Sequence, residues 1–410
     1  MRISTSTLFD VNVTALNTQQ SKLLHTQQQI STGRRILTPA DDPAAAAHVL
    51  QVSQADATNT QYVNNINKAQ DSVTLSEGTL ESATLLVQNI QTTAVNAGNP
   101  LLSNADRRIL AIDLQDKLDQ LTTMANTRDA VGNFLFSGFK GTTQPFVNTP
   151  TGVQYAGDDG QRLVQVSANR QLSTSDSGAD VFMRIKNGNG TFVTQPDPAN
   201  TGTGIASVGN VVNPALLTGN SYQIDFAVAA GVTTYTVTNT TTGLQVPPAP
   251  PVVNNPYVSA QSISFDGVQF DIQGAPANGD KFTVLPSTNE SVFKTISDLI
   301  NTLNTPLIPG NAAGTALLTA GINHGLTGMD NALNSVLTAR ASQGSRLTEL
   351  DSQKATVTDL GNQFKQTLSS LQDLDYNKAI TDLTQQKTML EAAQKSFLQV
   401  QNLSMFNFMQ

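Results

Sequence analysis

The chain has 410 residues, of which 39% are hydrophobic and 13% charged, and its formal net charge is −8. This length is sufficient for two or three domains. The acidic balance leaves no basic stripe that could neutralise phosphates, so nucleic acid is not expected as a partner. The absence of Cys excludes disulfides, thiolate metal sites and cysteine nucleophiles, and only 5% aromatic residues predict no large aromatic core.

The first 32 residues are expected to form one helix, which Gly33 ends. Apolar residues interrupted by glutamine recur along it at alternating spacings of four and three. These residues are Phe9, Val13, Leu16, Gln20, Leu23, Gln27 and Ile30. Heptad spacing of this kind places the side chains on one helix face and predicts a left-handed coiled-coil seam.

A connector over residues 34–42 precedes a second helix. Asp42 is a good N-cap and Pro43 suits the first helical position, so the Asp41-Asp42 pair is interpreted as connector and cap and not as paired catalytic carboxylates. This helix is expected to end at Gly98-Asn99-Pro100.

A capping box of Ser103 and Asp106 predicts a third helix over residues 104–131. An apolar face is expected along this helix. Its members are Ile109, Ile112, Leu114, Leu118 and Leu121.

Between Asn133 and about Pro286 the texture changes to short alternating runs separated by Gly, Pro, Asn and Thr, which predict strands and hairpins. Asp266-Gly267 and Asn278-Gly279 are candidate hairpin turns. Residues 246–256 (VPPAPPVVNNP) predict a polyproline-like loop.

Helix is expected again from Ser291, with a break at Pro306 and Pro309, and then from about Ala316 to the end of the chain. The last part repeats the heptad pattern with its own glutamine. The residues are Tyr376, Ala379, Leu383, Gln386, Leu390, Ala393, Phe397 and Val400.

Each heptad stripe needs a partner, and the stripe at the other end of the chain is the obvious one. The predicted fold class is therefore α+β: a long antiparallel helical bundle or coiled coil from both termini, with an inserted β-rich domain. Three domains are expected. They are terminal coiled-coil arms (1–32 and 376–410), a helical rod (33–145 and 287–375) and an inserted β-rich domain (146–286).

No motif predicts chemistry. His25, His48 and His324 are isolated and lack metal-ligand spacing. Residues 157–160 (GDDG) lack the alternating ligands of a calcium loop, and residues 187–190 (NGNG) are not followed by the Lys-Ser/Thr of a phosphate loop, so both predict turns. We expect no catalytic, cofactor-binding or metal-binding residues, no cofactor and no enzyme activity.

Glutamine in an apolar seam lowers stability and selects register or partner, which favours an assembly role over an ordinary core. We expect the arms to be poorly ordered in the free chain and to fold when many copies pack together. The expected interface residues are Phe9, Val13, Leu16, Leu23, Ile30, Leu383, Leu390, Phe397 and Val400.

Several segments resemble the flagellin superfamily. At the N-terminus these are MRIST followed by Phe9, and residues 27–46 (QQQISTGRRILTPADDPAAA). Within the superfamily, residues 132–146 (GNFLFSGFKGTTQPF), 155–182, 265–287 and 373–408 resemble the hook–filament junction proteins, or third hook-associated proteins. The ending NLSMFNFMQ differs from the Leu-Leu-Arg typical of flagellin.

The resemblance implies a structural subunit of the bacterial flagellum that joins hook to filament. The implied partners are further copies in a ring, the adjacent hook-associated protein, flagellin, and a cytoplasmic export chaperone that binds around Leu383, Leu390 and Phe397. It also implies an extracellular location, reached through the flagellar type III apparatus. The opening MRISTSTLFD has no signal-peptide pattern and no stretch is long and apolar enough for a membrane helix, so we expect neither a cleaved signal peptide nor membrane insertion.

Three alternatives stay open. The first is flagellin itself, the filament subunit. The second is an enzyme carried on a flagellin scaffold, although residues 133–286 offer no zinc-binding helix. The third is a coiled-coil adhesin whose β-domain binds host glycans, because residues 187–262 match no segment of known role.

Overall fold

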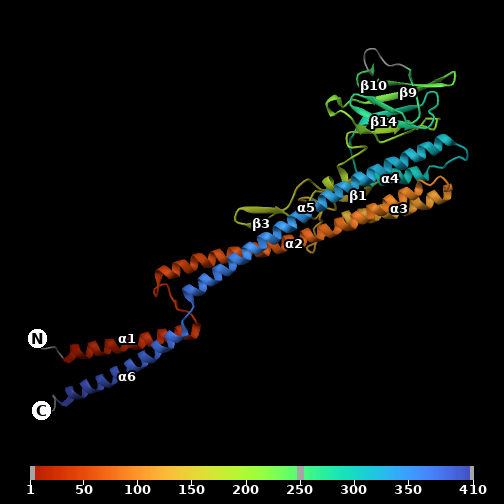
Figure 1. Ribbon diagram of the computed structural model, residues 1–410. Coiled ribbons are helices and arrows are strands. Elements are labelled where there is room, and N and C mark those ends of the chain that lie inside the picture. The colour runs from red at the N-terminus through yellow and green to blue at the C-terminus, as the bar shows by residue number, and fades with distance from the viewer. Residues whose placement is uncertain (1–4, 247–253, 407–410) are drawn as a thin grey trace. The chain divides into compact units, whose positions relative to one another are not determined.

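The computed structural model describes residues 5–246 and 254–406 (Figure 1). The chain forms two compact units, one from residues 1–65 and 352–410 and the other from residues 66–351. Both boundaries fall inside long helices, and the three-domain division expected from the sequence stays a prediction.

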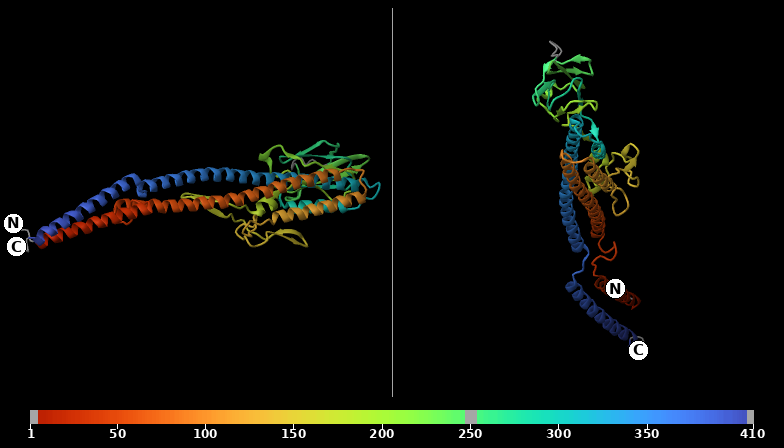
Figure 2. Two further views of the ribbon diagram at one scale, coloured as in Figure 1. Left: turned by 90° about the horizontal axis from the view of Figure 1, so that it is seen from below. Right: turned by 90° about the vertical axis from the view of Figure 1, so that its right-hand side faces the viewer.

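The first unit contains helices from both ends of the chain. Helix α1 (Thr5–Thr32) ends at Gly33, whose φ of +69° is the left-handed conformation that glycine adopts without strain. Helix α6 (Tyr376–Phe406) packs antiparallel beside α1 (Figure 1 and the left view of Figure 2). The unit also holds the first part of α2 (Pro43–Ala97) and the last part of α5 (Ala312–Gln372).

The predicted helix starts are confirmed where a cap is encoded locally. Asp42 Oδ1 accepts a hydrogen bond from the Ala45 N–H at 3.0 Å at the start of α2. Ser103 and Asp106 form the capping box of α3 (Asn104–Ala125). This helix ends six residues before the expected position, because the Asn126 side chain pairs with both backbone groups of Phe146.

The C-terminal helices differ in one respect from the prediction. Helix α4 (Val292–Asn304) begins at the Ser291 cap, but the expected continuous helix from Ala316 to the end is wrong. It is broken between α5 and α6, where Asp375 Oδ1 accepts from the N–H groups of Asn377 and Lys378 at 3.0 and 3.1 Å. Asp375 therefore caps a new helix.

Sixteen strands occur in the described residues, and every pairing between them is antiparallel. The two larger sheets have six and four strands. The strand order of the first is β11-β10-β9-β15-β6, with β12 beside β10, and that of the second is β13-β14-β7, with β8 beside β14. The remaining pairs are β1-β2, β3-β4 and β5-β16. The bounds are β1 (Phe146–Thr149), β2 (Gly152–Tyr155), β3 (Leu163–Ser167), β4 (Arg170–Ser173), β5 (Ile185–Lys186), β6 (Phe192–Pro196), β7 (Ile205–Ala206), β8 (Asn210–Val211), β9 (Tyr222–Ala229), β10 (Val232–Asn239), β11 (Leu244–Gln245), β12 (Asn255–Pro256), β13 (Ser262–Phe265), β14 (Val268–Gln273), β15 (Lys281–Pro286) and β16 (Asn289–Glu290).

Of the two candidate hairpin turns, one is confirmed. Asp266 and Gly267 both have positive φ and join β13 to β14, as a two-residue hairpin turn requires. Asn278-Gly279 is not a hairpin turn, because β14 and β15 belong to different sheets. Instead, the Asn278 side chain accepts a hydrogen bond from the Val228 N–H of β9 at 3.1 Å, and the Gly279 N–H donates to the Phe226 carbonyl at 2.9 Å. In the expected loop over residues 246–256, residues 247–253 lie outside the described ranges, and the end of the segment forms β12.

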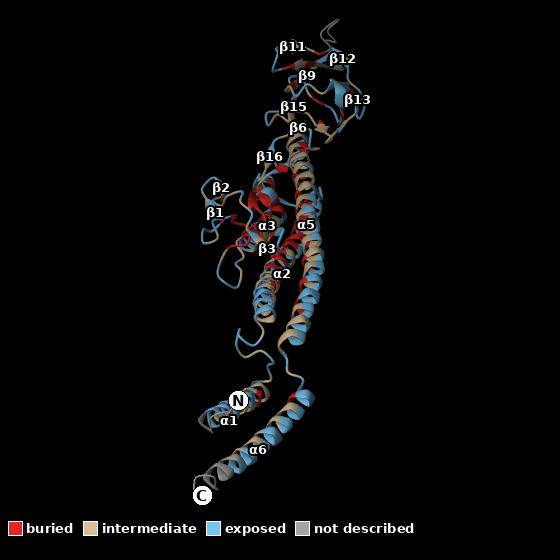
Figure 3. Ribbon diagram, turned by 90° about the vertical axis from the view of Figure 1, so that its left-hand side faces the viewer, coloured by how far each residue is buried: buried red, intermediate tan, exposed pale blue. Residues whose placement is uncertain are grey.

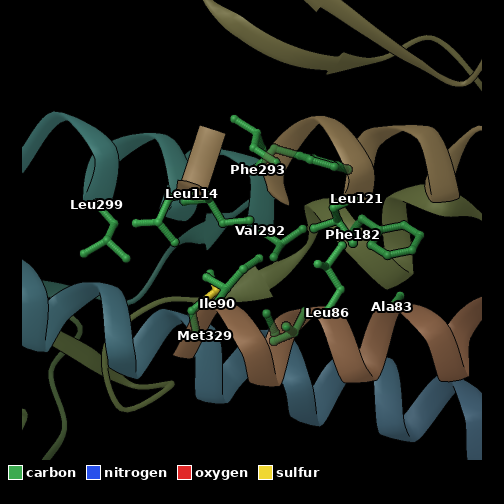
Figure 4. Close-up of a cluster of buried hydrophobic side chains, with 14 of the residues drawn as sticks. Ala83, Leu86, Ile90, Leu114, Leu121, Phe182, Val292, Phe293, Leu299 and Met329 are labelled. Atoms are coloured by element: carbon green, nitrogen blue, oxygen red, sulfur yellow. The ribbon is translucent and has the colours of Figure 1, made fainter. Parts of the chain in front are cut away.

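One hydrophobic core lies among α2, α3, α4 and α5 (Figure 4). In α3, Leu114, Leu118 and Leu121 face this core as expected. Ile109 and Ile112 do not: they are 64% and 59% exposed, because the buried stripe of α3 follows the line from Ala111 to Ala125.

The same core contains an aromatic cluster, which the low aromatic content did not predict. Phe146, Phe182 and Phe293 lie with ring centroids 5.2–6.1 Å apart, and Phe136 packs edge-on against Phe182. Phe146 and Phe182 belong to the region expected to form the β-rich domain. The hairpin β1-β2 and the short π-helical segment Ala179–Met183 therefore pack with the helices.

A second core lies between the larger sheets and draws on residues from Phe192 to Val284. It is built from Ile224, Phe226, Phe270 and Phe282, among others, on alternate positions of the strands. Residues 187–262, whose fold the sequence left open, supply half of it. This body is inserted through a narrow neck, since β5 and β16 pair with each other where the chain leaves the helices and returns.

Between the helices, α2 and α5 also share a buried polar cluster. The Gln343 side chain is fully buried and donates to Asp176 Oδ2 at 2.7 Å and to Ser76 Oγ at 3.3 Å. Arg346 donates to the other oxygen of Asp176 at 2.6 Å. Such a cluster fixes α5 against α2 and against the segment that holds Asp176, because a shift of α5 would take buried donors away from their acceptors.

Candidate assembly interface

The two arm helices, α1 and α6, meet along the seam that the heptads predicted. Near their free ends the Phe9 and Phe397 rings lie 5.3 Å apart, and near the middle the Gln19 side-chain amide donates to the Gln386 carbonyl at 3.3 Å. Ala379, near the start of α6, is 4% exposed. The seam therefore extends along most of both helices.

The structure places most of the predicted interface residues on the facing sides of the two helices. Phe9 is 48% exposed although its ring contacts Phe397, and the prediction for Val400 falls on a side chain that the structure does not describe. The others are half-buried. They are Val13, Leu16, Leu23, Ile30, Leu383, Leu390 and Phe397.

The glutamines are only partly where the sequence placed them. Gln386 is in the seam as predicted, and its Oε1 is buried without a partner among the described residues. Gln20 and Gln27 are exposed, and their neighbours Gln19 and Thr26 occupy the seam instead. Both patterns share Leu16, Leu23 and Ile30, so the heptad alone does not decide which flanking residue faces the partner helix.

The two arm helices contain few buried side chains compared with α2, α3 and α5. Figure 3 shows exposed and intermediate residues along α1 and α6, while buried residues concentrate on α2, α3 and α5. Large apolar side chains also face away from the seam. These are Val11 and Leu24 on α1, and Ile380, Met389 and Leu398 on α6. A two-helix pair with apolar side chains on its outer surface is incomplete by itself and indicates further packing partners.

Beside the arms, the chain crosses twice between helices. The connector after α1 holds Gly33–Asp42, whereas the crossing from α5 to α6 holds only Asp373–Asp375. Asp41 organises the longer one: its Oδ2 accepts from the N–H groups of Leu37 and Thr38 at 2.9 and 2.8 Å. These two bonds hold the pKa of Asp41 below its usual value, with a smaller contribution from His25.

The three histidines lie in different surroundings. His25 Nε2 lies 3.0 Å from Asp41 Oδ1, and His48 is exposed on α2. The Nε2 of His324 is buried without a partner in the described part of the chain, at the edge of a cavity of about 790 Å³ between β6 and α5.

The GDDG segment is a turn: Asp158 Oδ1 accepts from the N–H groups of Phe139 and Gly160, and Asp159 pairs with Arg184. The first two bonds lower the pKa of Asp158 and the guanidinium lowers that of Asp159. In residues 187–190 both glycines have positive φ, as in a turn.

Within residues 5–246 and 254–406, no group of three or more acidic or histidine side chains has the geometry to hold a metal ion. In the same ranges no helix has an apolar stretch sufficient to cross a membrane.

Comparison with known families finds two matches at the ends of the chain. The bacterial flagellin N-terminal helical region matches residues 3–141, and the bacterial flagellin C-terminal helical region matches residues 326–409. These ranges contain α1 and α6 and most of the helices they adjoin.

Relatives extend over the whole chain. It is 29% identical over 406 residues to flagellar hook-associated protein 3 of Escherichia coli (strain K12), with 99% of both chains covered. The crystal structure of flagellar hook-associated protein 3 from Legionella pneumophila superposes with a TM-score of 0.75 at 33% identity, covering 79% of this chain and 98% of that one. By contrast, B-type flagellin of Pseudomonas aeruginosa is 31% identical over 144 residues, which is 33% of this chain and 29% of the flagellin.

Proposed function

The chain belongs to the family of flagellar hook-associated protein 3, the hook–filament junction protein, and we propose that it assembles there through its paired arms α1 and α6. It is a structural subunit of the bacterial flagellum and acts in motility. Flagellin, the alternative from the sequence, is not supported to the same extent. The flagellin of Salmonella berta is 24% identical over 76% of this chain and 53% of its own length, whereas hook-associated protein 3 of Escherichia coli is 29% identical over 99% of both chains.

The assembly proposal rests on the apolar surface that the two arm helices leave exposed. Their seam is only half-buried, and Leu24, Ile380, Met389 and Leu398 are exposed on the outer sides. Packing of each arm pair against the arms of neighbouring copies would remove this apolar surface from water at about 25 cal/mol per Å². The proposed partners are therefore further copies in a ring, with the adjacent hook-associated protein on one side and flagellin on the other.

We expect the arms to be less ordered in the free subunit than in the assembled junction. A pair of helices with so small a core gains little stability from its own contacts. Far-UV circular dichroism of the free and assembled protein, together with limited proteolysis, measures this. Free subunits whose arms are fully helical and resist protease would contradict the expectation.

Export is the second part of the proposal. We propose that the chain leaves the cytoplasm through the flagellar type III apparatus without a cleaved signal peptide, and that a chaperone covers the α6 seam beforehand. Leu383, Leu390 and Phe397 are half-buried against α1, so a chaperone at this seam would occupy the place of α1.

Charged residues at those three positions should abolish chaperone binding in a pull-down with the full-length chain. The control variant carries charged residues at Thr384 and Ser396 and a reversed charge at Glu391. These three positions are exposed on the same helix, so this variant should still bind the chaperone. Unaltered binding by the seam variant would refute the chaperone site.

The proposed role is structural and not enzymatic, as in the flagellar relatives. A strain without this gene should keep its hooks but shed flagellin into the medium, as seen by electron microscopy and immunoblotting. Expression of the chain should restore attached filaments. A strain that retains filaments without the gene would contradict the junction role, and metal-dependent proteolysis by the purified chain would contradict the structural role.

A further inference from the structure

The two crossings beside the arms are joined to each other by backbone hydrogen bonds. The Arg35 N–H donates to the Gln372 carbonyl at 2.7 Å, and the Leu374 N–H donates to the Gly33 carbonyl at 3.0 Å. Between these bonds, Arg34 and Asp373 form an antiparallel bridge. The two non-helical breaks are thus a short two-stranded ladder and not two independent linkers.

Side chains strengthen this ladder from both sides. The Arg35 guanidinium donates to the Leu371 carbonyl at 2.8 Å, and Gln29 Nε2 donates to the Arg35 carbonyl at 2.6 Å. The Tyr376 hydroxyl lies against Gly33, where a Cβ would meet it at 3.0 Å. Gly33 therefore serves both the left-handed turn and the close approach of the Tyr376 side chain at the start of α6.

The two crossings differ in length, and they can pair because part of the longer one is folded into a turn. Three residues, Asp373–Asp375, cross between α5 and α6, whereas ten residues separate α1 from α2. Only the first part of the longer connector enters the ladder. The rest is folded into a turn in which Asp41 accepts two backbone N–H groups and Asp42 caps α2. The extra residues are taken up without separating the paired strands.

We infer that the two breaks work as one paired hinge, at which the arm helices bend relative to the adjoining ends of α2 and α5 without separation of the two chain crossings. A break in a helix gives up several i→i−4 hydrogen bonds and is the place where bending costs least. Because the strands are bonded to each other, a bend in one crossing carries the other with it. A load on either arm is then shared by both.

A cross-link tests the pairing directly. The bonds flanking Arg34 and Asp373 make these residues a non-hydrogen-bonded antiparallel pair, whose Cα atoms lie about 4.5 Å apart, within the range of a disulfide. The natural chain has no Cys, so Arg34→Cys with Asp373→Cys gives a single possible disulfide. In the purified full-length chain we expect nearly complete oxidation, read by mass spectrometry, and a loss of cross-linking in Arg34→Cys with Ser369→Cys. A pair at 34 and 373 that stays reduced in isolated flagella as well as in the purified chain would overturn the inference, because the arms are expected to be less ordered before assembly.

Proline variants test which bonds hold the ladder. Arg35→Pro removes the N–H that donates to Gln372 and should reduce the yield of the disulfide between positions 34 and 373. Arg35→Ala removes the same side chain, whose guanidinium donates to the Leu371 carbonyl, but keeps the N–H, and should give a higher yield than Arg35→Pro. Circular dichroism checks that both variants fold. Equal yields in the two variants would contradict a role for this bond.

The cross-linked protein also tests whether bending needs strand separation. The cytoplasm keeps thiols reduced, so the disulfide forms only after export. Cells carrying the double-cysteine variant should swim at the wild-type speed whether their flagella are oxidised or reduced. Swimming lost on oxidation and recovered on reduction would overturn the inference. If neither state assembles although the purified chain cross-links, the proposed assembly fails and the paired hinge stands.

Discussion

Phe9 and Phe397, which are separated by nearly the whole sequence, lie with ring centroids 5.3 Å apart and ring planes inclined by 48°. Phe9 nevertheless keeps 48% of its surface exposed. This contact joins the two ends of the chain but does not cover them, which is the condition expected of a subunit that completes its packing in an assembly.

Phe397→Asp should abolish assembly, because a carboxylate in the seam must be desolvated beside the Phe9 ring without a cationic partner. We expect loss of swimming in soft agar and flagellin in the culture medium. The control is Ser396→Asp, which adds the same charge at an exposed neighbouring position and should support normal swimming. Equal motility of the two variants would show that the seam is not needed.

Leu121→Ala should destabilise the core around α3 by about 2–5 kcal/mol, since Leu121 is 0% exposed and the change leaves a cavity. Ile112→Ala on the same helix removes a side chain that is 59% exposed and should change the free energy of unfolding by less than about 0.5 kcal/mol. Urea denaturation followed by circular dichroism measures both. The reverse order would mean that α3 packs through its other face.

Asp176→Ala should cost about 1–3 kcal/mol of unfolding free energy, because the buried donors of Gln343 and Arg346 lose their acceptor. Adding Arg346→Met should recover part of this loss, as expected for residues of one network. The exposed ion pair of Asp180 with Arg184 is a control, and Asp180→Ala should have little effect. Strict additivity in the double variant would argue against a shared cluster.

The turn at Asp41 should respond to acid. Its pKa is lowered in the folded chain by the backbone N–H groups of Leu37 and Thr38, so its contribution to stability is present above the unfolded pKa of about 3.9 and is lost as pH falls through the folded value. Hydrogen-exchange protection of these two amides, corrected for intrinsic rates, should persist from neutral pH to about pH 4 and then fall.

Two controls accompany this measurement. The Arg35 amide bonds to a carbonyl that does not titrate, and it should stay protected over the same range. Asp41→Asn should remove the acid transition at Leu37 and Thr38. Loss of protection between pH 7 and pH 5 would show that another group holds the turn.

Features that depend on neighbouring residues were predictable from the sequence. Asp42, and Ser103 with Asp106, mark the starts of α2 and α3 because a cap acts within one helical turn. Asp266-Gly267 marks a hairpin for the same reason, since its two positive φ angles fix the turn locally.

Features that depend on a distant partner were not predictable. Residues Asp373–Asp375 contain no Gly or Pro, and the Leu374 N–H leaves the helix for the carbonyl of Gly33. The choice of Gln19 over Gln20 in the seam depends on the side from which α6 approaches. Phe146, Phe182 and Phe293 gather from three separate segments, so a low aromatic content did not exclude an aromatic core.

The pairing of β5 with β16 closes the neck of the inserted body. Lys186 lies opposite Asn289 and Ile185 opposite Glu290, while the Asn187 N–H donates to the Thr288 carbonyl at 3.1 Å. The first and last residues of the segment between β5 and β16 are thus adjacent, as at the base of a hairpin. A gene segment for that stretch can be shortened to a tight turn or exchanged for a foreign domain, while the core below keeps its own contacts. A foreign epitope or an affinity tag placed in the inserted body should therefore leave the pairing of β5 with β16 intact.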